Sequence, residues 1–370
     1  MAAAPAVRSS RPDLSVVIPT HDRAASLLRT LGALARQSVA AERFEVVVAA
    51  DRCRDGTVEA VRHGHWPFSV RVAETAGGAA AARNAGAGAA RGELLLFLDD
   101  DVTLERGAIA AHLAAHAGHE RRLGVGDLPP EVQGDDFFAV ALRGWWEAMF
   151  DRLREPGVRL GYRDVLTGQL SIRARRFAEL GGFDSAFACH EDYEFGWRAT
   201  RAGLEIHFVA AAVGRHRETT TLARALARKR DEGRADVRLL RKHPALARAL
   251  PLWRLRGCAT DGASRGPRLE PWRRRLLRLL ATRAPKAGDL AARALRESLR
   301  AYEAVRLRQR WRARLDDVMG YWYWRGVYEE AGSDAALAAL LEEASKADHA
   351  GAVSGGAPCA DAAHAAAGID

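Results

Sequence analysis

The chain contains the stretch Arg91-Gly92-Glu93-Leu94-Leu95-Leu96-Phe97-Leu98-Asp99-Asp100-Asp101, in which an apolar run ends in three consecutive carboxylates. The apolar run predicts a strand that is buried on both faces, as in a parallel sheet. Three acids at the carboxyl end of such a strand repel one another, so the pattern favours a divalent-cation site made of oxygen ligands. In an extended chain Asp99 and Asp101 point to one side and Asp100 to the other. A solvated acidic turn is the alternative interpretation.

Short apolar segments alternate with helical segments from residue 14 to residue 210, which is typical of an α/β domain with a largely parallel sheet. Strands are expected at 14–18, 44–49, 68–72 and 93–98, and helices at 23–37, 57–63, 78–90, 105–117 and 191–201. The helix at 78–90 is rich in alanine and glycine, so we expect its backbone to pack closely on the sheet or on a ligand.

A less regular stretch is expected from residue 127 to residue 164. Its aromatic side chains form either an acceptor-binding wall or the core face of an inserted helix; they are Phe137, Phe138, Trp145, Trp146 and Phe150.

Length and composition describe an ordinary globular protein. The 370 residues can bury a large core and suggest about two domains. Residues 1–11 lack the apolar core of a signal peptide, and no apolar run reaches the length of a membrane span, so a cytoplasmic location is expected. Four scattered cysteines are expected to be free thiols; they are Cys53, Cys189, Cys258 and Cys359.

The net charge of +9 is unevenly distributed. Residues 222–330 hold 28 Lys and Arg against 12 Asp and Glu, a balance of +16, which leaves −7 for the rest of the chain. This asymmetry predicts a boundary near residue 220. We expect a flexible N-terminus over 1–12, an α/β domain over 13–217, a basic helical region over 218–350 and a disordered tail over 351–370.

Five separated motifs follow one another along the α/β region. They are Val16-Val17-Ile18-Pro19-Thr20-His21-Asp22-Arg23, then Asp51-Arg52-Cys53-Arg54-Asp55-Gly56-Thr57, Ala81-Ala82-Arg83-Asn84-Ala85-Gly86, Leu98-Asp99-Asp100-Asp101, and finally Gly181-Gly182-Phe183-Asp184 with His190-Glu191-Asp192-Tyr193-Glu194. In this order they resemble the signatures of the nucleotide-sugar-dependent glycosyltransferases of family 2, which have the GT-A fold. The second motif departs from that family, because Ala50 and Arg52 stand where an acid and a glycine are common.

The resemblance implies a Rossmann-like, mostly parallel sheet flanked by helices, with a mainly helical C-terminal extension. It also implies inverting, metal-dependent transfer of a sugar, of the hexosyltransferase type, from a nucleotide diphosphate sugar to an acceptor hydroxyl, with UDP as the favoured nucleotide. The implied nucleotide-sugar contacts are Pro19, Thr20, Asp22, Arg23, Asp51, Arg83, Asn84, Asp99 and Asp100. The implied ligands of Mn²⁺ or Mg²⁺ are Asp99, Asp101 and His216. For Arg83 and His216 a plain surface position is the alternative.

The reaction needs a base, because an acceptor hydroxyl is a weak nucleophile until a carboxylate takes its proton. We predict that Asp192 is this base, since the start of the helix at 191–201 favours the ionised carboxylate. A plain N-terminal cap is the alternative role of Asp192. Glu191 is expected to orient the site or to meet the acceptor. A non-catalytic sugar-nucleotide or glycan-binding protein with the same fold is the competing hypothesis.

The basic region has two segments of note. One helical face carries Trp272, Leu276 and Leu280 among arginines, as in an interfacial helix on an anionic membrane, and residues 321–325 read Tyr-Trp-Tyr-Trp-Arg. Three interpretations of these segments stay open. They are core faces of an accessory domain, a surface for peripheral membrane binding, or a subunit interface of a homo-oligomer. Nucleic acid ranks last as a partner, because no recognised nucleic-acid module is present. The acceptor is not predicted by any motif.

Overall fold

The computed structural model describes residues 11–256 and 272–352. Two compact units are present: the first consists of residues up to 132 together with 143–218, and the second of residues 133–142 together with the chain from 219 onward. The expected flexible N-terminus and disordered tail fall almost entirely outside the described residues, as do Cys258 and Cys359. The excursion of residues 133–142 into the second unit was not predicted, because composition does not change there.

The first unit is built on one eight-stranded mixed sheet with the order β3-β2-β1-β4-β7-β6-β8-β5. The four neighbours β3, β2, β1 and β4 are parallel, β7 runs antiparallel between β4 and β6, β8 is parallel to β6, and β5 is antiparallel to β8. The strands are β1 (Leu14–Thr20), β2 (Phe44–Asp51), β3 (Ser69–Thr75), β4 (Leu94–Leu98), β5 (Val102–Leu104), β6 (Arg122–Asp127), β7 (Gln169–Arg173) and β8 (Glu205–His216). The expected α/β architecture is thus confirmed, and the four strands after β4 were not predicted.

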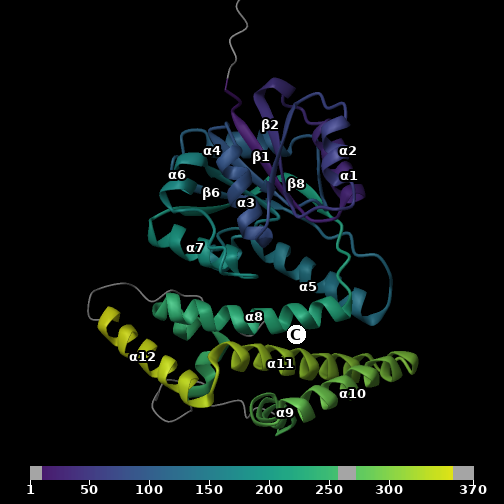
Figure 1. The fold of residues 1–370 in the computed structure, drawn as a ribbon, viewed down its shortest axis with the longest axis vertical. Helices are drawn as coiled ribbons and strands as arrows, with labels where there is room; N and C mark the ends of the chain where they lie inside the picture. Colours follow the sequence, from purple (N-terminus) through teal and green to yellow (C-terminus); the bar gives the residue numbers. More distant parts are fainter. Residues whose placement is uncertain (1–10, 257–271, 353–370) are drawn as a thin grey trace, which may run out of the picture. The chain divides into compact units, whose positions relative to one another are not determined.

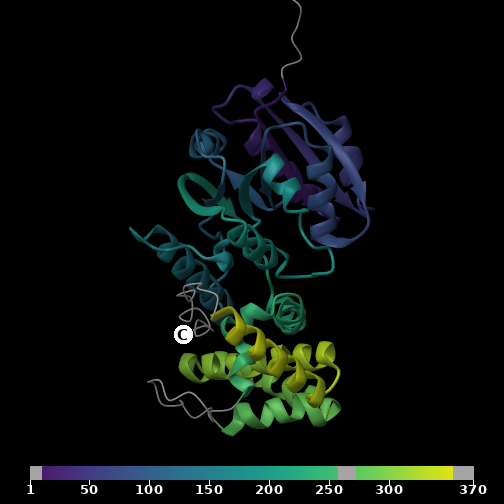
Figure 2. The ribbon, with the colours of Figure 1, turned by 90° about the vertical axis from the view of Figure 1, so that its left-hand side faces the viewer.

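Helices cover both faces of this sheet (Figure 1 and Figure 2). Alternating strand side chains separate two cores: Val16 and Leu96 pack into one, and Val17 and Phe97 into the other. The first core is closed by α1 (Ala24–Leu34), α2 (Thr57–His63), α4 (Ala108–His116) and the later part of α5 (Phe137–Arg154). The second core is closed by α3 (Gly78–Ala89), α6 (Ala174–Glu179) and α7 (Glu191–Arg201). Two 3-10 turns, η1 (Ala41–Arg43) and η2 (Tyr162–Asp164), lie in the connections.

Close packing of α3 on the sheet depends on a glycine, as expected. A Cβ atom placed at Gly86 would lie 2.5 Å from a methyl carbon of Val17 and 3.3 Å from the Cβ of Ala49. Any side chain at this position would push α3 away from β1 and β2. The helix carries Arg83 and Asn84, so Gly86 also determines how close these side chains come to the carboxyl ends of the strands.

A buried polar network lies under the middle of the sheet. The Nδ1 of His112 and the Nε2 of His116 lie 2.8 Å and 2.9 Å from the Oγ of Ser171, and the side-chain amide of Gln169 lies 3.1 Å from the Nε2 of His112. All four side chains are at most 1% exposed. Burial lowers the pKa of His112 to about 3 and that of His116 to about 4, so both rings are neutral.

The second unit is helical, as expected. Its elements are α8 (Leu222–Lys242), η3 (Pro244–Ala249), η4 (Pro251–Arg256), α9 (Trp272–Arg283), α10 (Pro285–Ala304), α11 (Arg308–Ala331) and α12 (Asp334–Ala352), joined by the first residues of α5. Helix α11 lies along α8 (Figure 1). Their backbones approach closely at two glycines, since a Cβ at Gly326 would lie 1.8 Å from the carbonyl oxygen of Arg230, and one at Gly233 would lie 2.1 Å from that of Tyr323.

The structure decides between the alternatives that the sequence left open for two aromatic segments. Both segments contribute to helical cores, and only the irregular conformation expected at 127–164 was wrong. The stretch at 127–164 contains the 18-residue helix α5, whose Phe137 and Phe138 pack in the second unit while Phe150 is buried in the first. The aromatic segment at 321–325 belongs to the core of the second unit, where Tyr321 is 1% exposed. In both segments, helical packing decided the position of aromatic residues that the local sequence left open.

Arginines of α8 are neutralised by acids of α11. Glu329 accepts from Arg230 and Arg234, and Glu330 accepts from Arg238 and Arg241. Part of the positive charge counted in the sequence is therefore paired with acids inside the second unit. Across residues 11–256 and 272–352, no helix is both long enough and apolar enough to cross a membrane.

Candidate functional site

The three acids of residues 99–101 lie in a turn at the carboxyl end of β4. The strand ends at Leu98, and the N–H of Val102 donates to the carbonyl oxygen of Asp99 at 3.2 Å, after which β5 begins. The expectation of an extended chain at residues 99–101 was therefore wrong, because a turn replaces strand alternation. The directions of the three carboxylates are set by separate partners.

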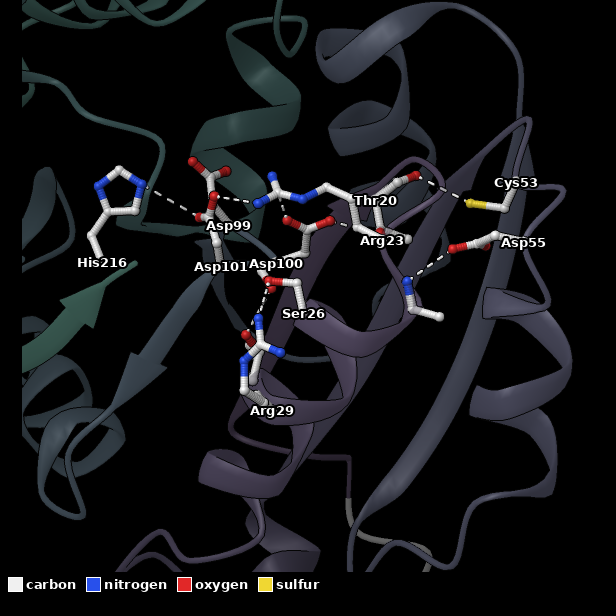
Figure 3. A network of polar contacts seen from close by, with 12 residues as sticks. Thr20, Arg23, Ser26, Arg29, Cys53, Asp55, Asp99, Asp100, Asp101 and His216 are labelled. Carbon is white, nitrogen blue, oxygen red and sulfur yellow. Dashed lines mark hydrogen bonds and ion pairs between the residues drawn. The ribbon is translucent and has the colours of Figure 1, made fainter. Parts of the chain in front are cut away.

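Asp100 points inward and holds the turn (Figure 3). Its carboxylate accepts from the Oγ1 of Thr20 at 2.7 Å and pairs with the guanidinium of Arg23 at 3.0 Å. Its carbonyl oxygen accepts from the Oγ1 of Thr30 at 3.0 Å. Burial, together with repulsion from Asp101 and Asp99, raises the pKa of Asp100 to about 6 despite these partners. Asp100 is 4% exposed and so has a structural position in the turn.

Asp101 lies between a guanidinium and an imidazole. Its Oδ2 accepts from Arg23 at 2.8 Å. Its buried Oδ1 makes no hydrogen bond and lies 3.5 Å from the Nε2 of His216. Burial lowers the pKa of His216, but the carboxylate of Asp101 more than offsets this, so the pKa is raised overall. The ring of His216 also packs edge-on against Trp146, with the centroids 5.3 Å apart. The alternative of a surface histidine was therefore wrong.

Arg83 joins the acidic turn to helix α7. It donates to Asp99 at 2.8 Å and to Glu191 at 2.7 Å, and its side chain is only 6% exposed. Burial lowers the pKa of Arg83, but the carboxylates of Asp99, Glu191 and Asp192 together raise it. The alternative of an exposed arginine was wrong. Arg83 brings the acidic turn and the first turn of α7, far apart in the sequence, into one ionic cluster.

Helix α7 begins immediately at the two predicted catalytic acids. His190 precedes the helix with φ 64°, and Glu191 and Asp192 occupy its first turn. The free amides of a helix N-terminus favour ionised carboxylates at this point. The side-chain oxygen of Asp192 accepts from the N–H of Tyr193 at 2.9 Å. Among the described residues, no three His, Cys, Asp or Glu side chains stand in a ready metal-binding group, and Asp99 is directed to Arg83.

Part of this cluster, Arg83 with residues 99–101, lies within a recognisable domain. Residues 15–180 match the family model described as Glycosyl transferase family 2. The domain is a member of glycosyl transferase family 2. Four of the five motifs quoted from the sequence lie within the matched residues, and the fifth, at 181–194, follows directly after them.

Two curated relatives extend the comparison beyond the family 2 domain. The validoxylamine A glucosyltransferase of Streptomyces hygroscopicus subsp. jinggangensis is 34% identical over 278 residues, which is 65% of this chain and 64% of that protein. The pre-mycofactocin glycosyltransferase of Mycobacterium tuberculosis is 28% identical over 243 residues, which is 64% of this chain and 49% of that protein. The chain therefore spans about half to two thirds of the length of these relatives.

A solved structure confirms the GT-A fold. The mannosyltransferase PcManGT from Pyrobaculum calidifontis, solved in complex with GDP-Man and Mn²⁺, has a TM-score of 0.53 at 18% identity and covers 87% of each chain. At this level of identity the likeness concerns the fold alone.

The loop before α7 is held by two side chains, Asn84 and Arg198. The amide group of Asn84 donates to the carbonyl oxygen of Phe183 at 2.7 Å and accepts from its N–H at 2.9 Å. Arg198 donates to the carbonyl oxygens of Leu180 and Gly182 and pairs with the fully buried Glu194. Asn84, predicted as a nucleotide-sugar contact, thus has both polar atoms engaged by the loop. Arg198 was not predicted, although its spacing of four residues from Glu194 on an expected helix was a usable signal.

Several residues predicted to contact the nucleotide lie at the carboxyl ends of β1 and β2. Pro19 is half-buried in β1, and Asp22 has φ 49° and accepts from the N–H of Arg54 at 2.6 Å. The two oxygens of Asp51 accept from the N–H groups of Gly77 and Gly78 at 3.0 Å and 3.1 Å, ahead of α3. Adjacent parallel strands bring these residues to the edge at which α/β sheets bind ligands.

Proposed function

We propose that this chain is an inverting, metal-dependent glycosyltransferase that transfers a sugar from a nucleotide diphosphate sugar, a UDP-sugar, to an acceptor hydroxyl. The proposal rests on two ion pairs of Arg83, one with Asp99 and one with Glu191, which connect the acidic turn to the first turn of α7. Candidate metal ligands and the candidate base thereby belong to one cluster. We assign this chemistry to residues 13–217 and an accessory role to the helical region 218–350.

The donor atoms around Asp101 fit a divalent cation. The buried Oδ1 of Asp101 lacks a hydrogen-bond partner and faces the Nε2 of His216, and Asp99 lies at the start of the same turn. Carboxylate oxygens and an imidazole nitrogen suit Mn²⁺, and carboxylates suit Mg²⁺. We propose that Asp99, Asp101 and His216 hold the ion. When bound there, the cation would offset the negative charge that develops on the departing diphosphate.

Asp192 is the proposed base. Its place in the first turn of α7 favours the carboxylate form, which is the form that can accept a proton from the acceptor hydroxyl. Glu191, tied to Arg83 at 2.7 Å, holds this turn in register with the acidic turn. A single base that assists direct attack on the anomeric carbon gives inversion, because the incoming oxygen enters opposite the leaving phosphate. Asn84 and Arg198 act as positioning residues for the loop that leads into α7.

Asp51 is consistent with a base that carries a ring N–H donor, and uracil is such a base. Each oxygen of its carboxylate accepts one backbone N–H, which leaves lone pairs for a further donor such as the imide N–H of uracil. The named glucosyltransferase relative supports a hexose as the sugar. Pro19, Thr20, Asp22 and Arg23 would contribute the remaining wall of the nucleotide site.

Calorimetric titration of UDP, GDP and dTDP, each with and without Mn²⁺, tests the donor site. We expect Mn²⁺-dependent binding of UDP that is lost in Asp101→Asn and retained in Glu179→Gln, which changes an exposed acid on α6. Binding of GDP or dTDP in place of UDP would overturn the uridine assignment. Absence of any nucleotide binding would favour a non-catalytic glycan-binding protein with this fold.

Asp192→Asn tests the base separately. With a UDP-sugar that turns over, the variant should retain calorimetric donor binding and lose transfer by roughly 10²–10⁴-fold, the usual contribution of a general base. Transfer at the wild-type rate would show that Asp192 is only a helix cap. The Glu179→Gln variant is the control for a change of one negative charge.

A further inference from the structure

Helix α9 of the second unit has one face in the core. Leu277 and Ala281 are 8% and 1% exposed and pack in the cluster around Tyr321. Arg273 and Arg274 reach back toward the same core, where they pair with Asp317 and Asp316 of α11 at 2.9 Å and 3.2 Å. This face of α9 therefore anchors the helix to the rest of the unit.

The opposite face of α9 exposes large apolar side chains. Trp272 is 77% exposed, Leu276 is 46% exposed and Leu279 is 43% exposed. At 3.6 residues per turn, positions 272, 276 and 279 lie within an arc of roughly 60°. The face expected from the sequence contained Leu280, but Leu280 is half-buried and Leu279 takes its place. Exposed apolar side chains gathered on one helical face mark a contact surface more often than scattered ones do.

Positive charge borders these apolar side chains. Arg275 is exposed beside them, and Arg283, with a side chain 75% exposed, lies on the same side of the helix one turn after Leu279. The sequence of α9 contains five arginines and no acid. Arg283 lies 3.8 Å from the exposed carboxylate of Asp334, and a surface contact of this kind is weak. Lys286 and Leu290 of the next helix, α10, are also exposed.

We infer that the outer face of α9, made of Trp272, Arg275, Leu276, Leu279 and Arg283, docks on an anionic lipid bilayer. A tryptophan and two leucines can enter the boundary between head groups and acyl chains, while the flanking arginines contact lipid phosphates. The absence of acids on α9 favours a negatively charged partner over a second copy of this positively charged unit. The face lies outside the residues proposed for catalysis, so the inference stands independently of the proposed function.

Co-sedimentation of the full chain with vesicles tests the inference. We expect binding to phosphatidylcholine vesicles that contain phosphatidylglycerol, little binding to pure phosphatidylcholine, and weaker binding at high salt. Replacing both Arg275→Gln and Arg283→Gln should lower the partition coefficient by about fivefold for each arginine. The pair Leu276→Ala and Leu279→Ala should lower it by about tenfold or more. Because all four side chains are exposed, these variants should fold, which circular dichroism checks.

A matched pair on α1 controls for general effects of charge and apolarity. Leu28 is 37% exposed, and Arg36 is exposed after the end of the same helix, so Leu28→Ala with Arg36→Gln should bind vesicles as the wild type does. Fluorescence quenching by lipids that carry a quencher in the acyl chain adds a second readout. Trp272→Phe should keep vesicle binding and lose most of the quenching.

Three results would overturn the inference. They are equal binding to neutral and anionic vesicles, equal binding by the wild type and the arginine variant, and no binding by the wild type. In the last case, light scattering measures the oligomeric state. If the wild type is a dimer and the variant with Leu276→Ala and Leu279→Ala is a monomer, the face is a self-association surface instead.

Discussion

The neutral histidines under the sheet predict that acid destabilises the first unit. His112 and His116 have folded-state pKa values of about 3 and about 4, far below the ordinary value of 6.5 that each regains on unfolding. At pH values between the folded and the unfolded pKa, the unfolded chain binds more protons than the folded one. The stabilisation from each neutral ring is therefore complete above pH 6.5 and is lost as the pH falls toward the folded pKa. At about pH 5 an unfolded histidine is almost fully protonated, and the linkage amounts to about 2 kcal/mol for each ring, or about 4 kcal/mol for both.

The hydrogen bonds of the network explain why the rings resist protonation. Gln169 donates to the Nε2 of His112, so His112 carries its proton on Nδ1 and donates to Ser171; His116 donates to Ser171 from Nε2. Ser171 in turn donates to the carbonyl oxygen of Gly124 at 3.3 Å. A second proton on His112 would face the amide donor of Gln169, and one on the buried Nδ1 of His116 would have no acceptor.

Urea-dependent hydrogen exchange of peptides from β6 and β7, at about pH 7.5 and about pH 5, measures this difference in the first unit alone. The variant with His112→Gln and His116→Gln should lose about 4 kcal/mol less than the wild type between the two pH values. Folding raises the pKa values of Asp100 and His216, so protonation of these two groups stabilises the folded state as pH falls. This contribution is the same in the wild type and the double variant, so it cancels in the comparison. The control His63→Gln changes an exposed histidine. Equal pH dependence of the wild type and the double variant would refute the reasoning.

Two further predictions concern close packing and the ionic cluster. Gly326→Ala should destabilise the second unit by about 1–3 kcal/mol in thermal unfolding, because its Cβ would meet the backbone of Arg230, whereas Gly320→Ala on the same helix meets nothing within 4 Å and should be neutral or stabilising. A stabilising Gly326→Ala would contradict the close crossing of α8 and α11. Arg83→Lys keeps the charge but cannot bridge Asp99 and Glu191 in two directions, so urea unfolding should show a loss of about 1.5–3 kcal/mol. The same change at the half-exposed Arg71, which has one ion pair with Glu45, should cost less, and equal losses would argue against a bridge.

Strong local patterns were sufficient for the front half of the sheet and its helices. The helices at 57–63 and 191–201 were predicted with the bounds that the structure has, because each follows a turn and has a clear apolar face. The apolar runs of β1, β2 and β4 were visible because both faces of these strands are buried. Strands β6 and β7 were not predicted, because their apolar pattern is interrupted by Gly124, Gly126, Gln169 and Ser171. Gly124 leaves room for Ser171 and His116, Gly126 leaves room for Gln169, and Gln169 and Ser171 contact the buried histidines.

The candidate site was likewise predicted only in part from local sequence. Local sequence identified the acids at 99–101 and 191–192, His216 and Arg83, since each belongs to a short motif. It did not predict that residues 99–101 form a turn, because strand alternation was extended past the end of β4. Nor did it predict that Asn84 would be occupied by the loop at Phe183, since that contact joins residues 99 positions apart.

By itself, the sequence determined the family 2 domain, its acidic motif and the basic character of the later helices, because these depend on residue type and short spacing. Only the tertiary structure decided which charges are used internally and which remain outside. The arginines of α8 meet Glu329 and Glu330 of α11, and Arg83 meets Asp99 and Glu191, whereas Arg275 and Arg283 stay at the surface beside Trp272. The physical reason is that an ion pair depends on distance in space, and helix packing and strand order bring together charges that the chain separates by tens of residues.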